Sequence, residues 1–216
     1  MIDPAMGHVH VLDDDADVRD SLGSFLRAEG FGVSLHAAPE SFFDAYDSKS
    51  PSCLLLDIRL EQADGLAVQE TLQRRDILVP IILMTGHGDV PMAVRGMKAG
   101  AVDFLAKPFS DVVLLTALAT ALERDMVRCR DAAEMLALRQ RHDSLTPREK
   151  EVAALVAAGL MNKQIGFELA LEVSTVKIHR GQVMRKMAAD SLADLVRMFE
   201  RLEMRLHGVR RHSRPS

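Results

Sequence analysis

Short apolar runs alternate with amphipathic stretches through the first half of the chain, and this alternation limits the fold more than any other feature. The apolar runs occupy residues 9–12, 32–36, 53–56, 80–84 and 104–106, and the amphipathic stretches occupy 18–29, 39–47, 64–75 and 90–99, followed by a helix from Asp111. Unbroken apolar runs are typical of strands buried on both faces, and parallel strands need crossover helices. We therefore predict an α/β doubly wound fold with a five-stranded parallel sheet.

The last third of the chain carries the signals of short helices. TPRE at 146–149 combines a capping box with Pro at the first helical position, so we expect a helix from there to Gly159. The other expected helices are one that follows Asn162 as its N-cap, one from Ser174 to about Met187, and one from Ser191 to Leu206. These four helices predict a small all-α module.

A long helix is expected to join the two parts, because no Pro or Gly interrupts residues 111–141. Along it Leu115, Leu122, Cys129 and Leu136 recur every seven residues, but Asp125 and Arg139 occupy the alternate core positions. Both a coiled coil and a solvated connector helix remain open. We predict three segments: a first domain at 8–122, a linker helix at 123–143 and a second domain at 144–208.

Charge divides along the same line. Residues 1–122 carry 18 acidic and 9 basic side chains, whereas residues 144–216 carry 8 acidic and 13 basic ones. An acidic front favours a cation or phosphoryl site, and a basic back favours a polyanion partner. No apolar run approaches the 18 residues of a membrane span, and only two cysteines are present. We therefore expect a cytoplasmic protein that binds no membrane. Residues 1–7 read as a leader outside the fold.

Polar residues follow the predicted strands where each one ends. Asp13 and Asp14 follow the first strand, Asp57 the third, Thr85 the fourth and Lys107 the fifth. Ligands of doubly wound sheets bind at this edge, and converging carboxylates repel one another unless a hard cation joins them. Mg²⁺ or Mn²⁺ suits such an oxygen-only site, with Asp57 as an ionised nucleophile toward phosphorus and with Lys107 and Thr85 as phosphoryl-oxygen partners. Solvated loop charge is the simpler alternative.

These motifs resemble response-regulator receiver domains, which have a flavodoxin-like fold. The matching stretches are VHVLDD at 9–14, LLLD at 54–57, MTGHGDVPMAV at 84–94 and MKAGAVDFLAKPF at 97–109, and the resemblance is closest to the FixJ-like branch. It implies that Asp57 accepts phosphate from a histidine kinase and that the Arg59 carbonyl joins Asp13 and Asp14 as a metal ligand. It further implies a Thr85 and Phe104 switch pair and a cis peptide before Pro108.

One departure from that family stands beside the expected site. Where relatives commonly have Met-Pro, this chain has Leu60-Glu61, so the loop lacks a rigid turn residue and gains a carboxylate. Tighter cation binding, altered dephosphorylation and loop drift without consequence all remain open.

The helix expected from Ser174 has two unlike faces. Val176, His179, Val183 and Met187 fall on one side, which predicts a buried stripe. The opposite side is small, cationic and apolar, which suits the DNA major groove, although a solvated helix would look similar. Its members are Ser174, Ile178, Gly181 and Arg185, flanked by Lys177 and Gln182.

The setting of this helix resembles LuxR-type helix-turn-helix domains. The matching stretches are LTPRE at 145–149, GLMNKQI at 159–165 and STVKIH at 174–179. The resemblance implies binding to double-stranded DNA, with Lys177 and Ile178 as base readers, and a last helix that pairs two subunits. The full set of expected DNA-contacting residues is Asn162, Lys163, Ser174, Thr175, Lys177, Ile178, Gly181 and Arg185.

Together these features predict a phosphorylation-controlled transcription regulator that forms a homodimer when phosphorylated. We expect no enzymatic activity beyond self-phosphorylation and autodephosphorylation. Two rivals remain: an aspartyl-phosphate hydrolase, whose usual second Asp is replaced by Arg59, and a DNA-binding scaffold that is independent of phosphate.

Overall fold

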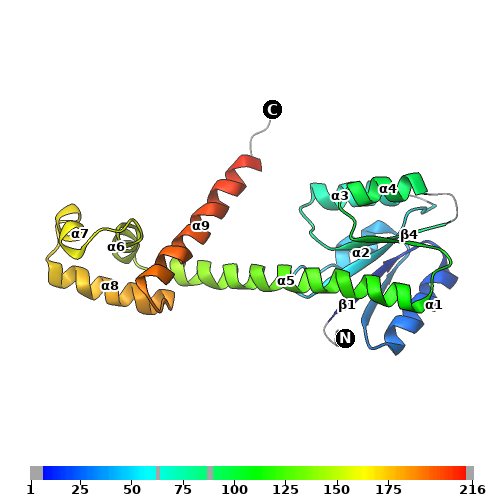
Figure 1. Cartoon of the computed structure of the whole chain (residues 1–216), viewed down its shortest axis with the longest axis horizontal. Coiled ribbons are helices and arrows are strands. Elements are labelled where there is room, and N and C mark those ends of the chain that lie inside the picture. The colour runs from blue at the N-terminus through cyan, green and yellow to red at the C-terminus, as the bar shows by residue number, and fades with distance from the viewer. Residues whose placement is uncertain (1–6, 62–63, 87–89, 213–216) are drawn as a thin grey trace. The chain divides into compact units, whose positions relative to one another are not determined.

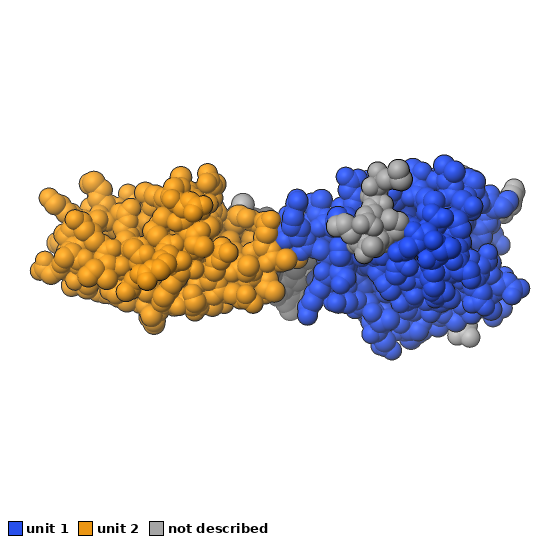
Figure 2. All heavy atoms as spheres, turned by 90° about the horizontal axis from the view of Figure 1, so that it is seen from below, with its two compact units in different colours: residues 1–131 blue, residues 132–216 orange. Residues whose placement is uncertain are grey.

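A computed structural model describes residues 7–61, 64–86 and 90–212, with the side chains of residue 90 and of residues 203–212 left out of the description. The expected leader at 1–7 lies outside these residues except for Gly7. The chain forms two compact units, Met1–Asp131 and Ala132–Ser216, which Figure 2 colours separately.

The N-terminal unit contains a parallel sheet of five strands in the order β2-β1-β3-β4-β5, which confirms the predicted doubly wound architecture (Figure 1). The strands are β1 (His8–Leu12), β2 (Gly32–His36), β3 (Ser52–Asp57), β4 (Ile81–Thr85) and β5 (Asp103–Ala106). All the residues of β3 and β4 are buried, as expected for the centre of a sheet covered on both faces.

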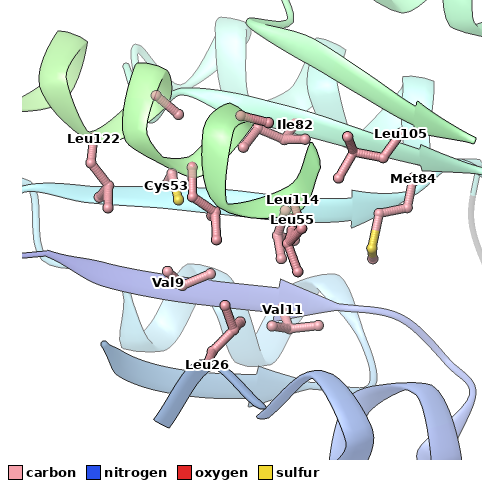
Figure 3. Packing of buried hydrophobic residues seen from close by; sticks show 13 residues of the cluster. Val9, Val11, Leu26, Cys53, Leu55, Ile82, Met84, Leu105, Leu114 and Leu122 are labelled. Atoms are coloured by element: carbon pink, nitrogen blue, oxygen red, sulfur yellow. The ribbon is translucent and has the colours of Figure 1, made fainter. Parts of the chain in front are cut away.

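Helices cover both faces of this sheet. The helices of the unit are α1 (Ala16–Ala28), α2 (Pro39–Ala45), α3 (Gly65–Arg74), α4 (Val90–Lys98) and the first part of α5 (Asp111–Asp143). Alternation along the strands divides the core: Leu55 and Ile82 pack with α1 and α5, whereas Leu54 and Leu83 pack with α2, α3 and α4. Figure 3 shows the first cluster, in which Leu114 and Leu122 of α5 lie over the sheet.

The heptad seam of α5 is used within the chain itself. Leu122 is buried and Leu115 packs against the same sheet core, whereas Leu136 is exposed. Every residue from 130 to 134 is exposed in the single chain. A coiled coil between two chains and a solvated connector both stay open for this segment.

Asp125 interrupts the seam because it has a different task. Its side chain is fully buried, Oδ2 accepts the backbone N–H of Ser52 at 2.9 Å, and Oδ1 accepts Arg128 Nε at 2.6 Å. Arg128 Nη2 also donates to the carbonyl of Ser48 at 3.1 Å. The carboxylate thus fastens α5 to the first residue of β3.

The C-terminal unit is all-α and packs around one apolar cluster that includes Val152, Ile165, Val176 and Val183. Its helices are α6 (Pro147–Ala157), α7 (Asn162–Glu168), α8 (Val173–Met187) and α9 (Leu192–His212), joined by the end of α5. The predicted capping box is confirmed: Glu149 N–H donates to Thr146 Oγ1, and Thr146 N–H donates to the Glu149 carboxylate.

Three helix ends differ from the sequence expectations. Asn162 is the first residue of α7 and not its N-cap; Met161 is the N-cap, and its N–H is held by Gln164 Oε1 at 2.8 Å. The helix expected from Ser174 begins at Val173 after Glu172, and the last helix extends beyond Leu206 to His212. No helix in the described part of the chain is long and apolar enough to cross a lipid bilayer.

Candidate functional site

The carboxyl edge of the sheet brings together Asp13, Asp14 and Asp57. One carboxylate oxygen from each residue lies within 4.8 Å of the others. Asp13 and Asp14 follow β1, and Asp57 ends the neighbouring strand β3, so strand pairing sets this proximity. Asp13 is fully buried and Asp57 nearly so. An oxygen-only cluster of this kind is compatible with Mg²⁺.

Lys107 lies between two of these carboxylates. Its Nζ is 2.7 Å from Asp13 Oδ2 and 2.5 Å from Asp57 Oδ2. The backbone N–H of Lys107 donates to the carbonyl of Thr85, which continues the β4–β5 pairing, and the peptide bond to Pro108 is cis, as expected. Burial alone would lower the pKa of Lys107, but its bonds to the two carboxylates outweigh that effect and raise it.

The surroundings of Asp57 disfavour the charged form of its carboxylate. Burial raises the pKa of Asp57 above its usual range and the charge of Asp13 adds to this shift, although bonds from Lys107 and from the Arg59 N–H act in the opposite direction. The Arg59 N–H lies 2.9 Å from Asp57 Oδ1. A partly buried ionisable group with a perturbed pKa at the edge of a sheet is the usual signature of a functional residue.

Thr85 and Phe104, the expected switch pair, lie on the neighbouring strands β4 and β5. Thr85 is the buried last residue of β4, and its hydroxyl donates to the carbonyl of Gly86 at 3.2 Å. Phe104, on the adjacent strand β5, has 44% of its surface exposed. Of the quoted motif around Thr85, residues 87–89 lie outside the described part of the chain.

Two contacts of the site were missed from the sequence. Arg19 Nη1 donates to the backbone carbonyl of Asp13 at 2.8 Å, and the N–H of Glu61 donates to Asp14 Oδ2 at 2.9 Å. Arg19 lies one turn into α1, a position that could have suggested a contact with the preceding loop. For the Glu61 contact the one signal was that residue 61 is not proline and so has a backbone N–H, which does not reveal the acceptor.

The exposed face of α8 agrees with the predicted helix orientation. Val176, Val183 and Met187 are fully buried, whereas His179 is half-buried with Nδ1 unpaired. Ile178 has 61% of its surface exposed. The other exposed candidates are Lys163, Ser174, Lys177, Gly181 and Arg185, and Thr175 is half-buried.

Asn162 has a partner that the sequence did not reveal. Arg180 Nη1 donates to Asn162 Oδ1 at 2.7 Å, which ties the start of α7 to the middle of α8. Since a guanidinium only donates, this bond turns the Asn162 oxygen toward α8 and leaves its NH₂ group as the donor for other partners. Both residues are half-buried.

Comparisons with known families match both units. The family described as response regulator receiver domain matches residues 9–119, and the bacterial regulatory proteins of the luxR family match residues 143–199. The first match includes every residue of the acidic site, and the second includes α6, α7 and α8.

Similar proteins align with nearly the whole of this chain. Nodulation protein W of Bradyrhizobium diazoefficiens is 49% identical over 195 residues, which cover 90% of this chain and 86% of that protein. Transcriptional regulatory protein FixJ of the same species is 41% identical, covering 92% and 97% of the two chains. The solved structure of response regulator StyR has a TM-score of 0.82 at 41% identity, covering 91% and 100%. The chain therefore belongs to the FixJ-like response regulators of two-component systems, which join a receiver domain to a LuxR-type DNA-binding domain.

Proposed function

We propose that phosphorylation of Asp57 by a histidine kinase controls DNA binding by the C-terminal unit. The observation that carries this proposal is the cluster of the buried Asp13 and Asp57 with the half-buried Lys107 at the carboxyl edge of the sheet. A carboxylate oxygen of Asp57 forms a P–O bond while the P–N bond of a phosphohistidine breaks, and the electron pair of that bond goes to the imidazole nitrogen. Lys107 then neutralises charge on the phosphoryl oxygens.

The metal ligands in this proposal are Asp13, Asp14, Asp57 and the backbone carbonyl of Arg59. Three carboxylates within 4.8 Å supply the hard oxygen donors that Mg²⁺ or Mn²⁺ prefers. When bound, such a cation offsets the repulsion among the carboxylates and the charge of the phosphoryl group. Lys107 already offsets part of this repulsion at Asp13 and Asp57.

Thr85 and Phe104 transmit the modification in this proposal. The Thr85 hydroxyl leaves the Gly86 carbonyl for a phosphoryl oxygen, and the ring of Phe104 turns inward to fill the space that Thr85 vacates. Apolar side chains are exposed on α4, on β5 and at the start of α5, including Val94, Met97 and Val112. This surface would pair two phosphorylated chains into a homodimer, with α9 as a second pairing element.

DNA recognition is assigned to the outer face of α8. Lys177 and Ile178 read bases in the major groove, and Gly181 and Arg185 lie on the same face. The phosphates around these bases are contacted by Asn162, Lys163, Ser174 and Thr175. In this proposal the receiver domain occupies residues 8–122, the linker helix 123–143 and the DNA-binding domain 144–208. The protein acts in the cytoplasm and binds no membrane. Its only chemistry is its own phosphorylation and dephosphorylation.

Treatment with acetyl phosphate and Mg²⁺ tests this function. We expect an 80-dalton adduct on Asp57, a dimer in sedimentation, and enrichment of two-fold DNA sites in a binding-site selection. Asp57→Ala should abolish all three responses. Unchanged dimerisation and DNA affinity in the modified wild-type protein would favour the phosphate-independent scaffold, and steady hydrolysis of phosphomonoesters would favour the hydrolase.

A further inference from the structure

Within the described residues, each carboxylate of the acidic cluster accepts one backbone N–H. Asp13 Oδ1 accepts the amide of Asp15 at 3.0 Å, and Asp57 Oδ1 accepts the amide of Arg59 at 2.9 Å. Both donors lie two residues along the chain from their acceptors, so these bonds form as the loop turns locally. Asp14 is different, because its donor is Glu61, 47 residues away in the loop after β3.

The second oxygens of the cluster differ in the same way. Lys107 binds Oδ2 of both Asp13 and Asp57, and so fixes these two side chains from the β5 side. Asp14 is only half-buried. Its bond to the Glu61 amide occupies Oδ2 and leaves Oδ1 outside that bond. Among the described residues, the Glu61 amide is therefore the contact that orients Asp14 across the site.

We propose that the backbone N–H of Glu61, and not its carboxylate, positions Asp14 as a cation ligand. The bond joins the loop after β1 to the loop after β3, which are the two loops that supply the three carboxylates. Holding a ligand oxygen in place before the cation arrives removes part of the entropy cost of binding. The Glu61 residue itself is exposed.

This inference also gives the departure at residue 61 a physical meaning. Proline has no N–H, so a chain with Pro at residue 61 cannot make the bond to Asp14 that this chain makes. The gain at this position is thus a backbone donor. The inference rests on the proposed metal site.

Titration of the metal-free protein with Mn²⁺, followed by the electron paramagnetic resonance signal of the free ion, tests the proposal. Glu61→Pro removes the amide hydrogen, and an amide-to-ester exchange at residue 61 removes it while keeping the carboxylate. Both should raise the Mn²⁺ dissociation constant about fivefold. Glu61→Ala is the matched control, because it keeps the amide and removes the carboxylate, and it should stay within about twofold of wild type.

A second measurement separates positioning from folding. The thermal midpoint of each variant in EDTA reports whether the metal-free fold is intact, and the ester variant serves if Glu61→Pro does not fold. In the absence of metal, the Glu61 amide proton should resonate upfield in Asp14→Ala relative to wild type, since the substitution removes the hydrogen-bond acceptor.

The possible failures are distinguishable. If Glu61→Ala weakens Mn²⁺ binding as much as Glu61→Pro does, the carboxylate is the ligand-side group and the inference is wrong. If the proline and ester variants bind Mn²⁺ as wild type does, the amide has no positioning role. If wild type itself binds no Mn²⁺, the proposed metal site fails.

Discussion

Two buried carboxylates lie at opposite ends of β3, and their surroundings are opposite in kind. At the start of the strand, Asp125 accepts the Ser52 N–H and two bonds from Arg128, and no other carboxylate of the described residues contacts it. At the other end, Asp57 shares Lys107 with Asp13, and burial raises its pKa. Removing a buried carboxylate that satisfies its partners destabilises a fold, whereas a carboxylate crowded by another is held at a cost and is a candidate for chemistry.

The largest test of this comparison is Asp125→Ala. The substitution leaves the Ser52 N–H buried without its acceptor and removes the partner of Arg128. We expect the free energy of unfolding of the N-terminal unit to fall by about 3 kcal/mol, measured by urea denaturation followed by circular dichroism. Glu123→Ala, at an exposed position on the same helix, is the control and should change it by less than about 0.5 kcal/mol. A loss below about 1 kcal/mol for Asp125→Ala would show that the pairing is not structural.

Burial also perturbs the histidines of the neighbouring strand β1 and of β2 beside it. His10 is buried, its Nδ1 lies 3.1 Å from His36 Nε2, and its ring packs edge-on against Phe42. Burial lowers the pKa of His10 to about 3, with His8 and His36 adding to the shift. Burial also lowers the pKa values of His8 and His36.

Stability should therefore fall as the pH falls from about 6.5 toward 3. In that window the unfolded chain binds a proton at His10 that the folded chain does not, so the slope approaches about 1.4 kcal/mol per pH unit for this residue. Urea denaturation of wild type and His10→Gln at several pH values measures the difference. His10→Gln should flatten the curve, and His142→Gln, in the C-terminal unit, should leave it unchanged for the N-terminal unit. Parallel curves for wild type and His10→Gln would contradict the assignment.

The sequence reveals the candidate site well because strand ends are local signals. Apolar runs locate β1, β3, β4 and β5, and the residue after each run falls at the same edge of the sheet, so Asp57 and Lys107 could be brought together without coordinates. The register of β1 with β3 then places Asp13 near Asp57. Periodicity on α8 likewise separates buried Val176 from exposed Ile178.

Contacts between distant segments leave no such trace. Asp125 looked like a flaw in a heptad, since nothing local shows that the first N–H of β3 needs an acceptor. The pairing of His10 with His36 depends on β1 lying beside β2, and the bond between Arg180 and Asn162 depends on how α7 packs on α8. Met161 is the N-cap of α7, and its N–H donates to the side chain of Gln164. The Met161 side chain offers no capping oxygen whereas that of Asn162 does, so the sequence alone favours the wrong residue as the cap.

At the other end of β3, substitution of Asp57 should change the free energy of unfolding in the direction opposite to that of Asp125→Ala. Because the pKa of Asp57 is raised, the folded chain binds its proton more readily than the unfolded chain, and stability falls as pH rises through the ordinary aspartate range. That cost persists at pH 7. Asp57→Asn should therefore stabilise the protein in EDTA at pH 7 while abolishing phosphorylation, measured by urea denaturation. Asp125→Asn is the matched control and should destabilise; a loss of stability for Asp57→Asn would remove the contrast.

The smallest expected effect is at Gly181 in the C-terminal unit, where we again ask whether a substitution at a candidate functional residue stabilises the fold. Gly181 lies inside α8, is exposed, and has open space where a Cβ would stand, so packing within the chain does not require glycine. Gly181→Ala should stabilise the unit by about 0.5 to 1 kcal/mol in urea denaturation. Gly166→Ala is the contrasting variant, since its Cβ would lie 2.7 Å from the carbonyl oxygen of Leu171 and should destabilise. If Gly181→Ala stabilises the unit and also weakens DNA binding, Gly181 resembles Asp57, a residue held at a cost for function; if it stabilises without affecting DNA affinity, the position has lost a contact and nothing more.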